Sequence, residues 1–175
     1  MDKKGKTFSI GFYTFLQQIG HGGFSDVYLV KHRDFKTYFV AKAMRAENDD
    51  LESKWETFEA EVKALSALSH PNIIRLYDHF KHKNKFYLFL EYCPNGSLHD
   101  ESISQGGMKL SRFHYVAREI VDALAYCHKR GVAHRDIKPA NVLIDAYYRA
   151  KIADFGLCAN TNPEELTENF GGSLS

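Results

Sequence analysis

The sequence predicts an α+β fold in which a small antiparallel sheet with one helix precedes a mainly helical region. The first half contains short stretches rich in Phe, Tyr and Val, separated by glycine or polar turns. The second half contains a long stretch with apolar residues at helical spacing. Between them, residues 94–97 read Pro-Asn-Gly-Ser, a turn cluster typical of a linker. We therefore expect two structural parts joined at this cluster.

Five strands and one helix are expected in the first part. The helix covers residues 51–69, because Phe58, Val62, Leu65 and Leu68 form one apolar stripe and His-Pro-Asn follows at 70–72. Residues 81–85 are rich in lysine and suit a solvated hairpin tip. The expected strands are residues 12–20, 25–32, 38–45, 73–80 and 86–92.

The second part is expected to contain a helix over residues 111–130, capped by Gly131. Two short strands near 142–144 and 150–152 and a loop to residue 175 follow it. The residues expected to line the buried side of the helix are Val116, Ile120, Val121, Leu124 and Cys127.

Composition narrows the class of protein. Hydrophobic residues make up 44% of the 175 residues, which is enough for a core. The net charge is only +1, so the composition gives no reason to expect a nucleic-acid partner. No apolar run reaches the roughly 20 residues that a membrane helix needs, and no secretory leader is recognisable. Three cysteines without Cys-x-x-Cys spacing suit reduced thiols. We expect an intracellular protein, cytoplasmic or nuclear, with no membrane partner.

A glycine-rich motif covers residues 20–27, with Gly20, Gly22 and Gly23 before Ser25 and Val27. Glycines let a backbone approach phosphates and direct its N–H groups at them. A dinucleotide fold would need a helix directly after the glycines, whereas a strand is expected here. Taken alone, the motif fits a glycine hairpin without a ligand equally well.

Lys42 lies among apolar residues in an expected strand, where a buried ammonium needs an anionic partner. Glu61 on the expected helix is a candidate partner that would hold Lys42 toward phosphate oxygens. Glu56 and Glu59 lie on the same helix, and helical phasing alone does not exclude Glu59. A surface lysine on an edge strand is the commoner alternative.

The most specific motif is His-Arg-Asp-Ile-Lys-Pro-Ala-Asn at residues 134–141. It places Asp136, Lys138 and Asn141 on one loop between a helix and a strand. Such a carboxylate can orient a hydroxyl, the lysine can steady a phosphoryl group, and the amide can bind a metal. Asp154 begins an Asp-Phe-Gly triplet thirteen residues after Asn141 and suits Mg²⁺.

In order and spacing these motifs resemble the eukaryotic serine/threonine protein kinase family over residues 12–175. The resemblance implies a protein-kinase-like two-lobe fold with a five-stranded antiparallel N-lobe sheet, one helix and a partial helical C-lobe. It divides the chain into an N-terminal extension (1–11), an N-lobe (12–92), a hinge (91–96) and a C-lobe (97–175). The family continues beyond this point, so the C-terminal part of the lobe is expected to be absent.

The resemblance also assigns roles residue by residue. Asp136 would be the catalytic base and Lys138 the phosphate-facing lysine, Lys42 and Glu61 would form an ion pair, and Asn141 and Asp154 would hold Mg²⁺. Leu90 falls at the gatekeeper position before the hinge. Leu65, Leu76, His134 and Phe155 would stack as an internal spine. The residues implied to contact ATP are Ile19, Gly20, His21, Gly22, Gly23, Phe24, Ser25, Val27, Val40, Lys42, Glu91, Cys93 and Leu143.

The implied activity is ATP-dependent transfer of the γ-phosphate to serine or threonine hydroxyls of protein substrates. Lys138 favours serine/threonine over tyrosine specificity, while the subgroup, calcium/calmodulin-dependent-like or NIMA-related-like, stays open. Ser97 and Ala140 replace glutamates found in arginine-directed relatives, which predicts weak selection for basic residues. The alternative is a truncated nucleotide- or partner-binding fragment with little activity, whose helix at 111–130 exposes an apolar patch.

Arg135 suggests that phosphorylation of the loop near residue 175 by an upstream activating kinase controls activity. Asn169 stands at the usual phosphorylated position, so Thr161 and Thr167 are the candidates. An unphosphorylated solvated loop is an equal alternative. Ser173 would contact the substrate side of Asp136.

Overall fold

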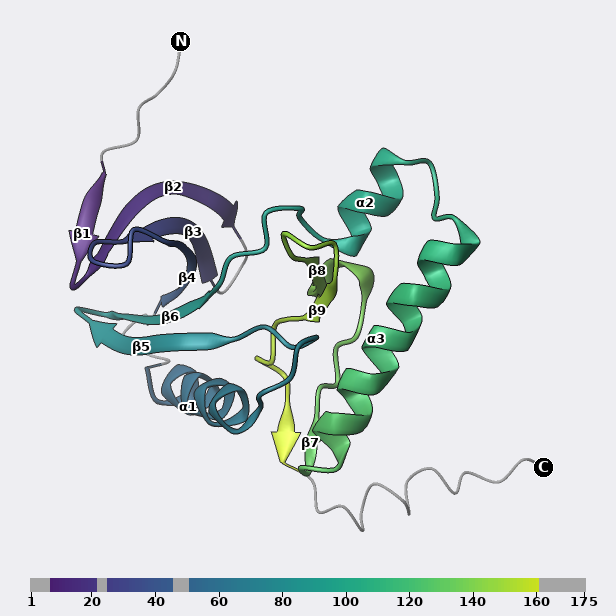
Figure 1. Cartoon of the computed structure of the whole chain (residues 1–175). Coiled ribbons are helices and arrows are strands. Elements are labelled where there is room, and N and C mark those ends of the chain that lie inside the picture. Colours follow the sequence, from purple (N-terminus) through teal and green to yellow (C-terminus); the bar gives the residue numbers. More distant parts are fainter. Residues whose placement is uncertain (1–6, 22–24, 46–50, 161–175) are drawn as a thin grey trace. The chain divides into compact units, whose positions relative to one another are not determined.

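The computed structural model describes residues 7–21, 25–45 and 51–160 (Figure 1). By its internal contacts the chain divides into two compact units. The first unit comprises Met1–Val62 and Arg75–Tyr92, and the second comprises Lys63–Ile74 and Cys93–Ser175.

The first unit is built on a strongly curved antiparallel sheet of six strands in the order β1-β2-β3-β4-β6-β5 (Figure 1). The strands are β1 (Phe8–Ile10), β2 (Tyr13–His21), β3 (Ser25–His32), β4 (Tyr38–Arg45), β5 (Leu76–His82) and β6 (Lys85–Glu91). Short hairpins connect consecutive strands, except that helix α1 (Leu51–Ala67) lies between β4 and β5.

The expectation of five strands was wrong because β1 adds a sixth within the predicted N-terminal extension. Gly11 turns the chain at φ 57°, a left-handed conformation that suits glycine. The Phe8 ring then stacks on Phe15 with centroids 4.5 Å apart, and Ile10 is buried. Three residues are too few for a strand to be recognised by alternation.

The predicted start of the strand over residues 73–80 was also wrong, since the observed strand β5 begins at Leu76. Ile74 donates its N–H to the Ile152 carbonyl at 2.9 Å, and Ile73 forms a bridge with the same residue. These two isoleucines are buried and belong to the second unit.

Helix α1 packs on one face of the sheet through aromatic side chains. The Phe58 ring stacks on Phe86 with centroids 5.1 Å apart, and Trp55 lies 5.2 Å from Phe86. Phe86 and Leu88 of β6 pair with Met44 and Lys42 of β4 and share their face. This packing brings the helix over the strand that carries Lys42.

The opposite face of the sheet holds a second apolar core rich in aromatic residues. Tyr13 stacks on Phe89 at 3.7 Å between ring centroids. The buried members of this cluster are Ile10, Tyr13, Phe15, Val30, Phe39, Ala41, Ala43, Tyr87 and Phe89.

The second unit contains α2 (Leu98–Ser104), α3 (Leu110–His128), and two pairs of short strands with one short helical turn. These are β7 (Val132–Ala133) with β10 (Ala159–Asn160), β8 (Val142–Ile144) with β9 (Ala150–Ile152), and the short helical turn Pro139–Asn141 before β8. Sequence analysis missed α2. Its signal was Ser97 and Asp100, which form a capping box: Asp100 N–H donates to Ser97 Oγ, and Ser97 N–H donates to Asp100 Oδ2.

Helix α3 buries Val116, Ala123 and Cys127, and Val116 packs with Val142 and Ala150 of the β8–β9 hairpin. Val121, predicted to be buried, is 62% exposed. At 100° per residue it lies well away from the direction shared by the three buried residues. Among the described residues, no helix has the length and apolar character needed to cross a membrane.

Candidate active site

Lys42 and Glu61 form a buried ion pair within the first unit. Lys42 Nζ on β4 lies 2.9 and 3.0 Å from the two carboxylate oxygens of Glu61 on α1. The side chains are 15% and 1% exposed. Glu56 and Glu59 are exposed on other sides of the helix, so the choice left open by the sequence falls on Glu61.

The pair forms because Phe58 and Glu61 are three residues apart on α1 and therefore share its face. Phe58 fixes that face against β6, next to the strand of Lys42. Val27 and Leu88 are the cross-strand neighbours of Lys42. The Lys42 side chain is largely buried, and a buried charge requires an anionic partner such as this carboxylate.

The glycine-rich hairpin joins β2 and β3. Gly20 lies opposite Val27, and a Cβ added at Gly20 would lie 3.2 Å from Val27 Cβ, so a larger residue would crowd this pair. His21 and Ile19 are exposed, and Ser25 is half-buried at the start of β3. The predicted contact residues Gly22, Gly23 and Phe24 lie outside the described residues.

Val27, Val40 and Lys42 share one face of the sheet. Val27 lies directly opposite Lys42 on the neighbouring strand, and Val40 lies two residues before Lys42 on β4, so its side chain points to the same side. Both valines are half-buried. At the predicted hinge, Glu91 donates its N–H to the Arg75 carbonyl at 2.9 Å, within the first unit. Cys93 is buried in the second unit.

Asp136 is the centre of a polar group in the second unit. Lys138 Nζ lies 2.6 Å from Asp136 Oδ2, and Asn141 Nδ2 donates to Oδ2 and to the backbone carbonyl of Asp136, each at 2.9 Å. The hydrogen bond from Lys138, with that from Asn141, holds the pKa of Asp136 below its usual range. The carboxylate is therefore ionised at neutral pH, and its side chain is 27% exposed.

His134 connects this loop to the Asp-Phe-Gly segment. Its Nε2 donates to the Ala153 carbonyl at 2.9 Å, and its Nδ1 accepts the Asp136 N–H at 3.3 Å. Burial lowers the pKa of His134, which suits the neutral tautomer that these two bonds require. The Phe155 ring meets the imidazole edge-on at 4.6 Å, so these two spine residues are in contact.

The two predicted metal ligands, Asn141 and Asp154, are connected through the backbone. Ala153, which precedes Asp154, donates its N–H to the Asn141 carbonyl at 2.8 Å. Asp154 is exposed and has φ 64°, a sparsely populated conformation for a residue with a side chain. Such backbone strain persists where surrounding contacts impose it, and it is common at functional sites.

These residues fit a hard cation such as Mg²⁺. Asn141 uses its NH₂ group toward Asp136, which leaves its amide oxygen as the acceptor, and Asp154 supplies a carboxylate. Within the described part of the chain, no group of three or more His, Cys, Asp or Glu residues could hold a metal ion. Mg²⁺ is commonly bound by one or two protein oxygens together with substrate phosphates, so a two-residue donor set suits it.

Comparison with known proteins identifies the family to which a chain with these loops belongs. The protein kinase domain model matches residues 13–175. The chain belongs to the protein kinase family. It is 40% identical to maternal embryonic leucine zipper kinase of Danio rerio, 36% to Aurora kinase B of Xenopus tropicalis and 33% to CBL-interacting serine/threonine-protein kinase 3 of Arabidopsis thaliana. These matches cover 84 to 86% of this chain but only 21, 42 and 34% of those relatives.

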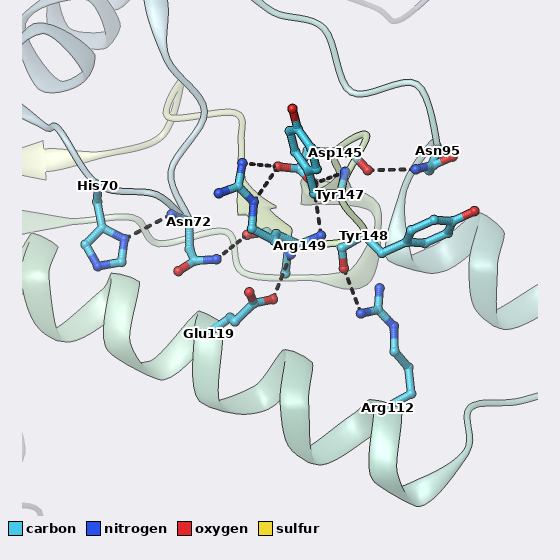
Figure 2. Close-up of polar contacts among 10 residues, drawn as sticks. His70, Asn72, Asn95, Arg112, Glu119, Asp145, Tyr147, Tyr148 and Arg149 are labelled. Atoms are coloured by element: carbon cyan, nitrogen blue, oxygen red, sulfur yellow. Dashed lines mark hydrogen bonds and ion pairs between the residues drawn. The ribbon is translucent and has the colours of Figure 1, made fainter.

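In this kinase domain Leu143 lies half-buried on β8, and a polar network fixes the hairpin that carries it (Figure 2). Asp145 accepts the backbone N–H groups of Tyr147 at 2.8 Å and Arg149 at 2.9 Å and so closes the β8–β9 turn. Asn95 donates to the Asp145 carbonyl at 2.7 Å. The turn therefore has a fixed conformation although its tyrosines are exposed.

Side chains from outside the hairpin hold its second strand. Glu119 of α3 accepts the Ala150 N–H at 2.8 Å, and Asn72 donates to the Ala150 carbonyl at 2.9 Å (Figure 2). Arg112 of α3 donates to the Tyr148 carbonyl at 2.8 Å. Sequence analysis read Asn72 only as part of a helix stop. Its position in a polar triplet between two apolar segments was the available signal for a buried hydrogen-bonding role.

Of the residues predicted to take part in regulation, the structure describes Arg135. Arg135 is exposed and has φ 66°. Thr161, Thr167, Asn169 and Ser173 lie outside the described residues. Control by phosphorylation and the role of Ser173 remain predictions.

Proposed function

We propose that this domain transfers the γ-phosphate of ATP to serine or threonine hydroxyls of protein substrates. The observation that carries the proposal is the ionised, solvent-accessible carboxylate of Asp136, oriented by Lys138 and Asn141. Phosphoryl transfer needs positioning and charge neutralisation more than covalent chemistry. The domain carries polar side chains suited to both.

Asp136 would accept a hydrogen bond from the attacking hydroxyl. Because its pKa is lowered, the carboxylate is a weak base, and its main contribution would be to orient the hydroxyl oxygen toward the phosphorus. Lys138, whose side chain is 52% exposed, can move from Asp136 to a phosphate oxygen as charge develops there.

Lys42, held by Glu61, would bind phosphate oxygens of ATP. Val27 and Val40, on the face of Lys42, offer the apolar surface that an adenine ring needs. Asn141 and Asp154 would hold Mg²⁺, which when bound neutralises charge on the phosphates. The donor chemistry of these residues supports this assignment.

The choice of a hydroxyl on serine or threonine rests on Lys138 within the Asp136 loop and on the serine/threonine-protein kinase of Arabidopsis among the relatives. Ser97 caps α2, and neither Ser97 nor Ala140 carries a negative charge. We therefore expect weak selection for basic residues in the substrate. Substrates would be intracellular proteins, cytoplasmic or nuclear, and an upstream kinase would act through Arg135.

The test is transfer of radiolabelled phosphate from ATP to a generic protein substrate. Incorporation should occur with the wild type and fall to background in Asp136→Ala. Asp122→Ala is the matched control, because Asp122 is an exposed carboxylate on α3. Thermal stabilisation by MgATP without any transfer would instead support a non-catalytic nucleotide-binding module.

A further inference from the structure

A buried carboxylate lies beside the glycine-rich hairpin. Asp26, the second residue of β3, is 4% exposed. Arg45 at the end of β4 binds it with two nitrogens: Nη2 lies 2.7 Å from Oδ1 and Nε lies 3.0 Å from Oδ2. This two-point geometry is the strongest form of an arginine–carboxylate pair.

Two further side chains from β2 converge on Asp26. His21 Nδ1 lies 2.7 Å from Oδ1, and Gln18 Nε2 donates to the same oxygen at 3.2 Å. Gln18 also donates to the Gly20 carbonyl at 3.3 Å. The carboxylate therefore joins three strands, and through Gln18 it reaches the backbone of the first glycine.

The strand pairing is irregular at this point. The β2–β3 register shifts between Gln18 and Gly20, so the regular ladder is interrupted just before the glycine-rich hairpin. His21 pairs with Asp26 beyond the irregularity. The polar cluster of Gln18, His21, Asp26 and Arg45 adds side-chain contacts on both sides of this irregularity.

The cluster lies on the far face of the sheet from Lys42. Asp26 pairs with Ala43, whereas the next residue, Val27, pairs with Lys42, and successive residues of a strand face opposite sides. Ala43 belongs to the aromatic core on that far face. A nucleotide bound on the face of Lys42 could not touch Asp26.

We propose that Asp26 is a positioning residue that fixes the ends of β2 and β3 for binding the phosphates of ATP. It acts through Gly20, His21 and Ser25, which flank the loop, and it contacts no substrate atom. The inference rests on the proposed function, since it requires ATP as the ligand. Its specific consequence is that loss of the carboxylate weakens binding of the triphosphate and not of adenosine.

The experiment compares the affinities for MgATP and for adenosine in the wild type and in Asp26→Asn, by titration calorimetry. Asn keeps the size of the side chain but loses the charge that binds Arg45. We expect the Kd for MgATP to rise about tenfold, as a small misplacement of binding groups can produce, and the Kd for adenosine to stay within about twofold. Asp34→Asn is the matched control, because Asp34 pairs with Arg33 at the exposed β3–β4 turn of the same sheet.

Arg45→Lys is a second variant, in case Asp26→Asn fails to fold. It keeps the positive charge but not the two-point geometry, so it should raise the KM for ATP with little change in kcat. Equal weakening of MgATP and adenosine, or unchanged affinity for both, would reduce Asp26 to a structural role and overturn the inference. A wild type that does not bind MgATP at all would overturn the proposed function itself, and this inference with it.

Discussion

Two lysine–carboxylate pairs in this domain share a similar geometry and differ in their surroundings. Lys42 and Glu61 are 2.9 Å apart, and Lys138 and Asp136 are 2.6 Å apart. In the first pair the side chains are 15% and 1% exposed, whereas in the second they are 52% and 27% exposed. The first pair is held by apolar neighbours between a strand and a helix, and the second lies on a loop.

The difference indicates two uses for the same chemistry. A desolvated pair has a high cost of separation, so it keeps Lys42 in one position. An exposed pair costs little to separate, because water screens it. Lys138 can therefore leave Asp136 for a phosphate oxygen, and Asp136 can then accept a hydrogen bond from a substrate hydroxyl. The predictions below test this contrast.

Lys42→Met should have the largest effect, on catalysis. We expect phosphate transfer to fall about a thousandfold, as happens when a preorganised electrostatic contact is removed, because phosphate alignment fails. The protein should still unfold cooperatively in a circular dichroism melt, because methionine fills a similar volume, but at a lower temperature, because the buried Glu61 carboxylate loses the Lys42 ammonium. A collapse of folding in this variant would mean that Lys42 has a structural role instead.

Glu61→Gln should lower the free energy of unfolding by about 3 kcal/mol, because the buried ammonium of Lys42 loses its carboxylate. The double variant Lys42→Met/Glu61→Leu should recover most of that loss while remaining inactive, since breaking a buried pair costs more than replacing it. Urea titrations of the three proteins make the comparison. If the double variant is as unstable as Glu61→Gln, desolvation is not the reason for the cost.

Asp26 should make stability depend on acid pH. The hydrogen bond from Arg45, with that from His21, lowers the pKa of Asp26 from 3.8 to about 2 in the folded protein. Because the folded pKa is the lower one, this contribution of about 2 kcal/mol is present above pH 4 and is lost as the pH falls toward 2. Denaturant midpoints between pH 5 and pH 2 should fall more steeply in the wild type than in Asp26→Asn. Parallel curves for the two proteins would contradict the assignment.

Ser97→Ala should have the smallest effect, about 1 kcal/mol, because it removes one half of the capping box of α2. This capping contact should matter less than the ion pair of the first unit, because losing a cap costs less than leaving a buried charge without its partner. Chemical denaturation measures it, with Ser104→Ala at the other end of the same helix as the control. If Ser97→Ala lowered the free energy of unfolding as much as Glu61→Gln does, the expected order of the two effects would be wrong.

Local patterns predicted most of the first unit. Alternation and turn residues gave β2, β3, β4 and β6 within about one residue, and the apolar stripe of α1 made Glu61 one candidate partner of Lys42, with Glu56 and Glu59 left open. The choice among the three glutamates depends on the packing of Phe58 against Phe86, which cannot be predicted from the sequence alone. The motif spacing likewise predicted the loop of Asp136 but not its hydrogen bonds.

The features that were missed depend on contacts between distant segments. Strand β1 is too short to show a period, and Ile73 and Ile74 look like a strand although their partner is Ile152. Val121 fits a loose apolar pattern but lies off the buried direction of α3. Asp26 carried no sequence signal, because its role depends on Arg45, which reaches it across the sheet.

We propose that Lys42 and Asp154 serve the same reaction, Lys42 as a ligand of the ATP phosphates and Asp154 as a ligand of Mg²⁺. The Mg²⁺ dependence of ATP affinity in Lys42→Met and Asp154→Asn tests it directly. We expect both variants to weaken binding with Mg²⁺ present, and only Lys42→Met to weaken it when Mg²⁺ is removed. An Asp154→Asn variant that binds MgATP as tightly as the wild type would contradict the claim.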